Sequence, residues 1–408
     1  MKNDKEKQSI KDLSTALLKV LESKNYSAGR LAYYRRILLR IGEFMKKKKI
    51  AHYSENVGDI FFSDYISKKA CSIHYRRYVK TVLRRLNELY NGHDFSLAKK
   101  PLEILPPPPF AGLLEGYTQS CKSTGNKAIT IAAKRRFCLD FLYNINNAGC
   151  KNTHEINSNS ICTAILKIGN TDSYAAIRSF LRYLYENGAL TNDFSGIIPR
   201  YRRPIPLPTT YTRDEITRLE NTINRSTRTG KRNYAIILLA SRLGIRAGDI
   251  AGMTLDAIDF NRGSIGFIQG KTGQPLSLPL LPQIREAVQD YIQHARPNVQ
   301  NNYVFIQAKA PFEQITTSII RHALSRCFRT AGINIANKKH GTHALRSSMA
   351  SSMINSAVSY EVVRKALGHV DPQAIKRYAR VDSENLRIYA LDVPAPSGLF
   401  AAVLQGGQ

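Results

Sequence analysis

Apolar residues recur at helical spacing through residues 1–207, with basic residues on the opposite face of each expected helix. Two stretches of this pattern resemble each other, because residues 31–36 (LAYYRR) align with residues 131–136 (IAAKRR), 100 positions further along. Each stretch later reaches an Asn-Gly pair, at Asn91 and at Asn187, which is a helix-stop signal. The pattern predicts two small all-helical units, unless the likeness is a chance similarity between two basic helical segments.

Residues 208–392 combine two periodicities. Thr212 and Glu215 have the spacing of a capping box, which predicts the start of a helix. A further helix is expected over 233–243, where Gly244 ends it. Beyond a short strand region, the remainder up to about residue 392 is expected to be helical.

The strand region has the pattern of a hairpin. Residues 264–268 and 276–280 alternate apolar and polar side chains, as half-buried strands do. They flank residues 270–273 (GKTG), which are typical of a hairpin tip. The expected fold class is therefore mainly α with a small β-hairpin or sheet (α+β), preceded by the two all-helical units.

Proline-rich stretches mark the expected boundaries. Residues 105–110 and 199–208 hold several prolines, which disfavour helix and central strand and make extended spacers. The second stretch is also basic, so it either follows a DNA backbone or is an ordinary solvated linker. The expected domains are 1–104, 105–207 and 208–392, followed by a tail at 393–408.

Charge indicates the partner. The 408 residues carry a formal net charge of +29, which points to a polyanion and most often to nucleic acid. The alternatives are a ribosomal-type or a membrane-surface basic protein. Arginines on the basic sides of the helical units and in the second proline-rich stretch are the candidate DNA contacts: Arg35, Arg36, Arg135, Arg136, Arg200, Arg202 and Arg203.

Cysteine usage and hydropathy indicate the compartment. The six cysteines show no C-x-x-C spacing, so reduced and mostly buried thiols are expected, with no metal site and no cofactor. No apolar stretch is long enough to span a bilayer, and the N-terminus lacks a signal-peptide core. We therefore expect a cytoplasmic, nucleoid-associated protein.

Tyr378 is the candidate nucleophile of a phosphodiester-cutting site without metal. A phenol has a pKa of about 10, so roughly one in a thousand is ionised at pH 7. The reaction needs cations for the phosphoryl oxygens and an acid for the leaving oxygen. Asp371 and Pro372 predict a helix start just before the tyrosine. The basic residues that precede it are Arg246, Lys271, His343, Arg346 and His369.

Local spacing favours these roles. His343 and Arg346 lie three apart in the first turn of an expected helix, so both project from one face. Asp249 lies three residues after Arg246 and could orient that arginine or a histidine. Lys271 on a hairpin tip can move into a groove.

In this order and spacing the motifs resemble those of the tyrosine recombinases of the phage integrase type. The matching positions are the arginine motif at 244–249 (GIRAGD), the hairpin Lys271, the H-x-x-R box at 343–346, the Leu-Gly-His box at 367–369 and the nucleophile Tyr378. Asp249 stands where the family commonly has glutamate. The resemblance is strong over 208–392 and weaker over 105–207, and residues 1–104 depart from the minimal two-domain plan.

The resemblance implies a reaction. Tyr378 would attack a scissile phosphate and leave a 3′-phosphotyrosine and a free 5′-hydroxyl, which a partner strand exchanges through a Holliday junction. The implied roles are phosphate binding by Arg246, Arg346 and His369, acid by Lys271 and base by His343.

The resemblance also implies partners. SAM-like helical domains, an N-terminal one and a core-binding one, would clamp double-stranded DNA at specific recombination sites together with the catalytic domain. A homotetramer would form on two sites, with the tail at 393–408 docked on its own domain or on a neighbouring protomer. Accessory DNA-bending or directionality factors, or sister recombinases, could take part.

Other functions remain open at this point. A type IB topoisomerase shares the covalent chemistry, but it acts as a monomer without paired sites. A DNA-binding regulator with the same fold would have an inactive site. Among recombinases, the added helical domain favours an integrase or transposase of a mobile element over Xer-like resolution of chromosomes or plasmids.

Overall fold

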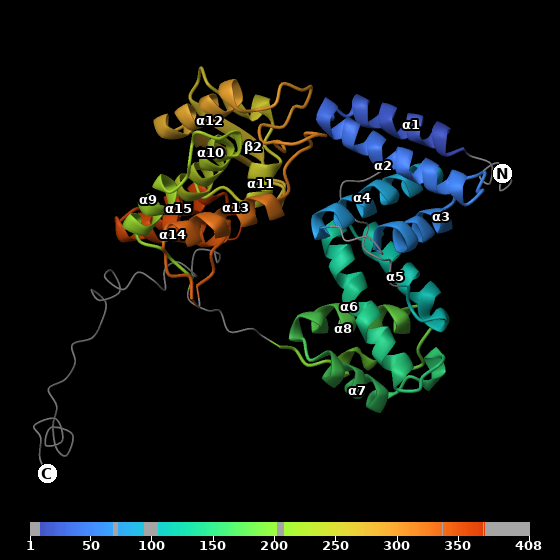
Figure 1. Cartoon of the computed structure of the whole chain (residues 1–408). Coiled ribbons are helices and arrows are strands. Elements are labelled where there is room, and N and C mark those ends of the chain that lie inside the picture. The colour runs from blue at the N-terminus through green and yellow to red at the C-terminus, as the bar shows by residue number, and fades with distance from the viewer. Residues whose placement is uncertain are drawn as a thin grey trace, which may run out of the picture. The chain divides into compact units, whose positions relative to one another are not determined.

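The computed structural model describes residues 9–67, 72–93, 105–201, 208–336, 338–369 and 371. Within these ranges the chain is mostly helical and has one small sheet, as the sequence predicts (Figure 1). The chain divides into two compact units, residues 96–204 and the combination of 1–95 with 205–408. No helix in the described ranges is long and apolar enough to cross a lipid bilayer. The domain boundaries given above stay a prediction.

The N-terminal helices enclose a core of their own. They are α1 (Ile10–Ser23), α2 (Ala28–Lys47), α3 (Glu55–Ile60), which continues as a π-helical turn over Phe61–Ser67, and α4 (Ile73–Tyr90). Leu17, Leu21 and Ile41 are fully buried in this core. Asn91 is the C-cap residue of α4 and is followed by Gly92 with a φ of 72°, so the first predicted helix stop is confirmed.

Residues 96–204 form the second compact unit. After a 3₁₀ turn at Pro108–Phe110 come α5 (Ala111–Ser123), α6 (Ala128–Asn147), α7 (Ser158–Ile168) and α8 (Tyr174–Glu186). Their apolar faces meet around the fully buried rings of Phe141 and Phe180. The second predicted stop is also confirmed, because Asn187 is the C-cap residue of α8 and Gly188 has a φ of 70°.

Helices α2 and α6 repeat the same local structure. Both have 20 residues, and they begin at Ala28 and Ala128. Left-handed residues precede both helices, at Asn25 (φ 59°) and Gly125 (φ 74°), and others follow them, at Lys49 (φ 55°) and Gly149 (φ 99°). The left-handed residues on both sides of α2 thus recur 100 positions later on both sides of α6.

The C-terminal segment contains α9 (Arg213–Asn221), α10 (Arg228–Arg242), α11 (Ala247–Ala251), α12 (Pro282–His294), α13 (Thr317–Thr330), α14 (Thr342–Asn355) and α15 (Tyr360–Leu367). The capping box before α9 is confirmed, since Glu215 N donates to Thr212 Oγ1 at 3.1 Å and Thr212 N to Glu215 Oε2 at 2.8 Å. Helix α10 begins earlier than the predicted residue 233, because Thr227 Oγ1 caps it by accepting from Gly230 N at 3.0 Å.

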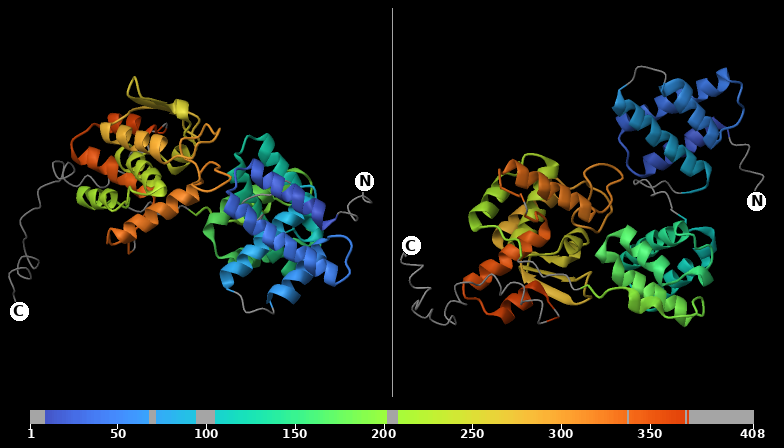
Figure 2. Two further views of the ribbon diagram at one scale, coloured as in Figure 1. Left: turned by 45° about the horizontal axis from the view of Figure 1, so that its top comes forward. Right: turned by 90° about the horizontal axis from the view of Figure 1, so that it is seen from below.

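A three-stranded antiparallel sheet is attached to these helices and is drawn in yellow in Figure 2. It has the order β1 (Ile258–Asp259), β2 (Ser264–Ile268), β3 (Pro275–Pro279). Ile265 lies opposite Leu278, and both side chains are buried. The predicted hairpin of β2 and β3 is confirmed, whereas β1 is too short to show a periodicity in the sequence.

The expectation of helix throughout the rest of the chain is wrong for residues 295–316. Ile306 and Gln314 form an isolated β-bridge there. Arg296 donates to the carbonyl oxygens of Tyr303 at 2.9 Å and Val304 at 3.2 Å. The arginine thus satisfies backbone acceptors that a helix would otherwise pair.

Candidate active site

Arg346 lies in the first turns of α14 and is 3% exposed. Its Nη1 donates to the carbonyl of Gly244 at 2.7 Å, and its Nη2 donates to the carbonyl of Leu367 at 2.5 Å. A buried cation is costly unless such partners compensate for lost water. The guanidinium therefore joins α14 to the turn after α10 and to the end of α15.

Gly244 allows the side chain of Arg346 to come close to the backbone after α10. It has a φ of 61°, which favours glycine. A Cβ at this position would lie 2.9 Å from Met349 Sδ, 3.2 Å from Leu367 Cδ2 and 3.4 Å from Arg346 Cγ. Gly244, predicted as the residue that ends the helix, is therefore also packed closely against Arg346.

Arg246 is the N-cap residue of α11, so it lies between α10 and α11 as predicted. Its Nη1 is 4.0 Å from Asp249 Oδ2, and the two side chains are 23% and 5% exposed. Asp249 Oδ1 accepts a hydrogen bond of 2.8 Å from Gly270 N. The aspartate therefore links Arg246 to the β2–β3 hairpin.

Lys271 lies at the tip of that hairpin and is exposed. The tip is closed by hydrogen bonds from Gln269 N to Gln274 O at 2.9 Å and from Gly273 N to Gln269 O at 2.8 Å. The sequence placed the lysine correctly, and the structure adds that its backbone is held on both sides.

His369 follows Gly368, the left-handed C-cap residue of α15. Burial, and after it the electrostatic effects of the basic residues Arg346, Arg246, His343 and Lys271 in that order, lower the pKa of His369 from 6.5 to about 4. The imidazole is therefore neutral at pH 7 without DNA. The other four basic residues predicted for the site thus lie within electrostatic reach of His369.

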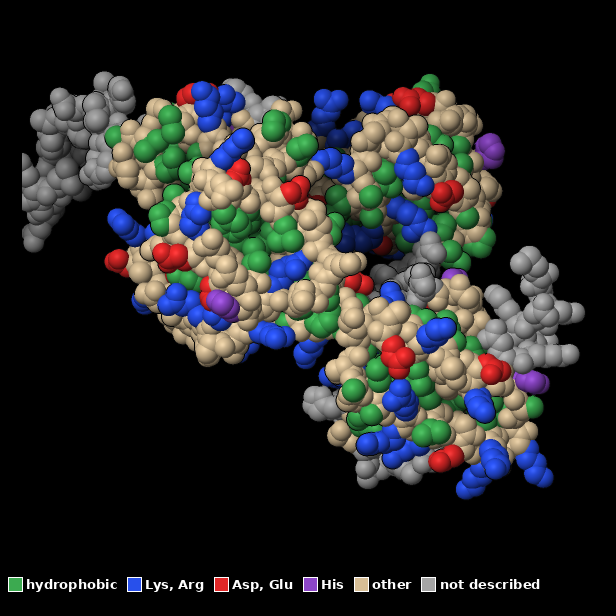
Figure 3. Space-filling view, turned by 90° about the horizontal axis from the view of Figure 1, so that it is seen from above, with side chains coloured by type: hydrophobic (Ala, Val, Ile, Leu, Met, Phe, Trp, Pro, Cys, Tyr) green, Lys and Arg blue, Asp and Glu red, His purple; other side chains and the backbone are tan. Residues whose placement is uncertain are grey.

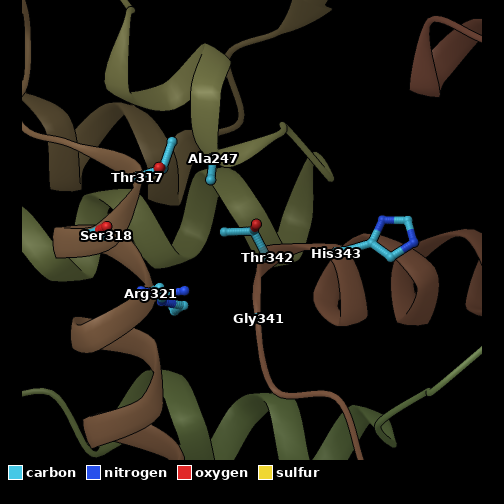
Figure 4. A pocket seen from close by; sticks show the side chains of 7 residues that line it. All are labelled: Ala247, Thr317, Ser318, Arg321, Gly341, Thr342 and His343. Atoms are coloured by element: carbon cyan, nitrogen blue, oxygen red, sulfur yellow. The ribbon is translucent and has the colours of Figure 1, made fainter. Parts of the chain in front are cut away.

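His343, the second residue of α14, is exposed beside a hollow of about 250 Å³ (Figure 4). Thr317 and Thr342, the first residues of α13 and α14, also line it, together with Arg321. Helix N-termini carry partial positive charge, so with the guanidinium they favour an anion. Arg321 was not among the residues predicted from the sequence. The helix start at Thr316-Thr317-Ser318, one turn before it, is the sequence signal that could have pointed to it.

The remaining predicted residues are placed as follows. Arg36, Arg136 and Arg200 are exposed, Arg135 is half-buried, and Arg35 pairs with Glu22 at 3.1 Å. Lysine and arginine side chains are spread over the face shown in Figure 3. Some predictions fall outside the described residues. They concern Arg202, Arg203, Tyr378 with the helix expected around it, and the tail at 393–408.

The chemistry of this cluster is that of an anion site. Two arginines, two histidines and a lysine come together, and Asp249 is the carboxylate that lies among them. Guanidinium groups suit phosphate oxygens because their donors form a fixed planar fork. Among the described residues no group of three or more His, Cys, Asp or Glu is arranged to hold a metal ion.

Comparison with known proteins finds a family match in the C-terminal segment. Residues 210–385 match the sequence model of the phage integrase family. The chain is 36% identical over 226 residues to the integrase/recombinase y4rA of Sinorhizobium fredii, a match that covers 54% of this chain and 53% of that protein. It therefore spans about half the length of this relative. It is also 25% identical over 243 residues to the tyrosine recombinase XerC of Staphylococcus aureus, covering 53% of this chain and 80% of XerC.

Solved structures share the fold. A lambda integrase (75–356) dimer bound to a COC′ core site matches with a TM-score of 0.51 and 17% identity, covering 70% of this chain and 99% of that one. XerH bound to its difH substrate matches with a TM-score of 0.52 and 17% identity, covering 82% and 95%. At these identities the likeness concerns the fold.

Proposed function

We propose that this protein is a site-specific DNA recombinase that cuts and rejoins DNA through a 3′-phosphotyrosine intermediate and a Holliday junction. The observation that carries the proposal is the anchoring of Arg346 on the carbonyls of Gly244 and Leu367. This anchoring brings the segments that carry Arg246 and His369 to one place. Preorganised cations of this kind stabilise the charge that develops on a phosphate under attack.

The proposed cleavage step is balanced in protons and bonds. The phenol oxygen of Tyr378 attacks the phosphorus, and the bond from phosphorus to the 5′ oxygen breaks. His343 takes the phenol proton, and Lys271 gives a proton to the departing 5′ oxygen. The phosphodiester energy stays in the tyrosine ester, so rejoining needs no ATP.

The phosphate would be held by three groups. Arg346 and Arg246 each bring a guanidinium group, whose planar set of N–H donors suits phosphate oxygens. His369 is neutral in the free protein because of burial and neighbouring cations. A neutral imidazole still donates one N–H, and a bound phosphate anion would offset the surrounding positive charge.

The helical units would bring the DNA. Their repeated turns and the arginine pairs at 35–36 and 135–136 support two SAM-like DNA-binding domains, 1–104 and 105–207, ahead of a catalytic domain at 208–392. A lambda integrase tetramer bound to a Holliday junction matches with a TM-score of 0.50 and 17% identity. We propose the same assembly for this chain on two sites, in an integrase or transposase of a mobile element.

A nicked suicide duplex made from the DNA that flanks its gene tests the proposal. We expect a covalent protein–DNA adduct that resists denaturing electrophoresis and is absent for Tyr378→Phe. Tyr360→Phe is the matched control, since that tyrosine is an exposed first residue of α15, and it should keep the adduct. A wild-type protein that binds this duplex and forms no adduct would refute the proposal in favour of a DNA-binding regulator.

A further inference from the structure

Gln269 is a polar residue at a fully buried position, where apolar side chains are usual. It follows β2 directly, and only 1% of it is exposed. Its Nε2 donates to the carbonyl of Leu367 at 3.3 Å, and its Oε1 accepts from Thr272 Oγ1 at 2.8 Å. A buried amide persists where its hydrogen bonds offset the loss of water. Here those bonds connect the hairpin tip to a segment 98 positions away.

The carbonyl that Gln269 contacts is the one that anchors Arg346. Leu367 O accepts from Arg346 Nη2 at 2.5 Å and from Gln269 Nε2 at 3.3 Å. One backbone oxygen thus has both a guanidinium and an amide as donors. The residues that follow it are Gly368 and His369, so the hairpin is tied to the arginine and the histidine at the same point.

The hairpin tip is fastened on both sides of the lysine. Gln269 holds Leu367, Gly270 N donates to Asp249 Oδ1 at 2.8 Å, and Thr272 Oγ1 donates back to Gln269. Lys271 lies between Gly270 and Thr272. Its backbone is therefore positioned relative to both arginine-bearing segments before any DNA arrives.

The contact between Gln269 and Leu367 also requires a glycine at position 368. It has a φ of 59°, and a Cβ built on it would overlap the Gln269 amide. The glycine of the Leu-Gly-His box therefore serves two purposes, because it ends α15 and leaves room for Gln269.

We propose that Gln269 is a positioning residue that holds the Lys271 hairpin in register with Arg346 and His369, so that the lysine can protonate the leaving 5′ oxygen. This inference rests on the proposed function. Gln269 does not touch the reacting atoms and acts through the lysine.

The test replaces the leaving oxygen with sulfur. Once the scissile phosphate is mapped from the adduct, the same duplex is made with a 5′-bridging sulfur at that phosphate. A thiol has a pKa of about 8.5, against about 16 for water, so sulfur leaves without a proton. Single-turnover cleavage at saturating DNA is measured on both duplexes for wild type, Gln269→Met and Lys271→Ala.

Gln269→Met keeps the side-chain length and removes both hydrogen bonds. We expect it to slow cleavage of the oxygen duplex about tenfold to 100-fold, as a misplacement of about 1 Å does. On the sulfur duplex its rate should lie within about twofold of wild type, as for Lys271→Ala. Gln274→Met, an exposed position of the same tip, is the matched control and should be normal on both duplexes.

The outcomes separate the two proposals. Equal slowing of Gln269→Met on both duplexes would overturn the positioning role. If Lys271→Ala is not rescued by sulfur either, the inference falls, while the wild-type adduct still supports the recombinase. Should Gln269→Met melt at a lower temperature than wild type, Thr272→Val removes one of its two bonds, and the same selective rescue is required of it.

Discussion

Arg346 Nη2 lies 2.5 Å from the carbonyl oxygen of Leu367, two residues before His369. The other terminal nitrogen of the guanidinium reaches Gly244 O at 2.7 Å, two residues before Arg246. One buried side chain thus sets the separation of two predicted phosphate-binding residues. Arg346 therefore both holds these two segments together and belongs to the proposed phosphate site.

Arg346→Lys should therefore impair both stability and cleavage. A single ammonium cannot occupy both nitrogen positions of the fork. We expect the free energy of unfolding to fall by about 1–3 kcal/mol, as for an unsatisfied buried acceptor. The rate of adduct formation should fall about 100-fold or more. Urea unfolding and single-turnover cleavage measure the two effects, and Arg262→Lys at an exposed arginine should change neither.

Gly244→Ala should destabilise the protein through crowding. The new Cβ meets Met349, Leu367 and Arg346 within 3.4 Å, at a φ of 61° that disfavours a side chain. We expect a loss of about 1–3 kcal/mol in urea unfolding. Gly248→Ala is the matched control, because a methyl group there would meet no atom within 4 Å outside its own helix and its chain neighbours. Equal stability of the two variants would contradict the packing role of Gly244.

His369 should make stability depend on pH. Its folded-state pKa of about 4 lies below the ordinary 6.5. Between about pH 6.5 and pH 4 the unfolded chain therefore binds a proton that the folded chain does not, so stability falls as the pH falls through this window. His369→Gln should give a shallower fall in urea unfolding measured at several pH values. His322→Gln, at an exposed histidine, should keep the wild-type slope.

Arg321→Ala should weaken DNA binding, because it removes a positive charge that can contact a DNA phosphate. Its guanidinium shares the hollow beside His343 with the first residues of α13 and α14. Loss of one phosphate contact should reduce the slope of log Kd against log salt concentration by about 1. Filter binding or fluorescence anisotropy at several salt concentrations measures it. Arg329→Ala, at the other end of α13, should leave the slope as it is.

Much of the local structure followed from short-range rules. The capping box at Thr212 and Glu215, the hairpin around Lys271 and the stops at Asn91 and Asn187 all depend on residues within a few positions of one another. Such signals are visible in the sequence because the hydrogen bonds that they form are local. The start of α10 and the loop over 295–316 were missed, since the first depends on a single cap and the second on contacts of Arg296.

The sequence by itself determined which chemistry-bearing residues exist and in what order, because side-chain type and motif spacing are properties of the chain. Only the tertiary structure decided how they meet. The contacts of Arg346 with Gly244 and Leu367, and of Gln269 with Leu367, join positions 102, 21 and 98 residues apart. The pKa of His369 depends on burial and on four basic residues from other segments, so no local pattern encodes it.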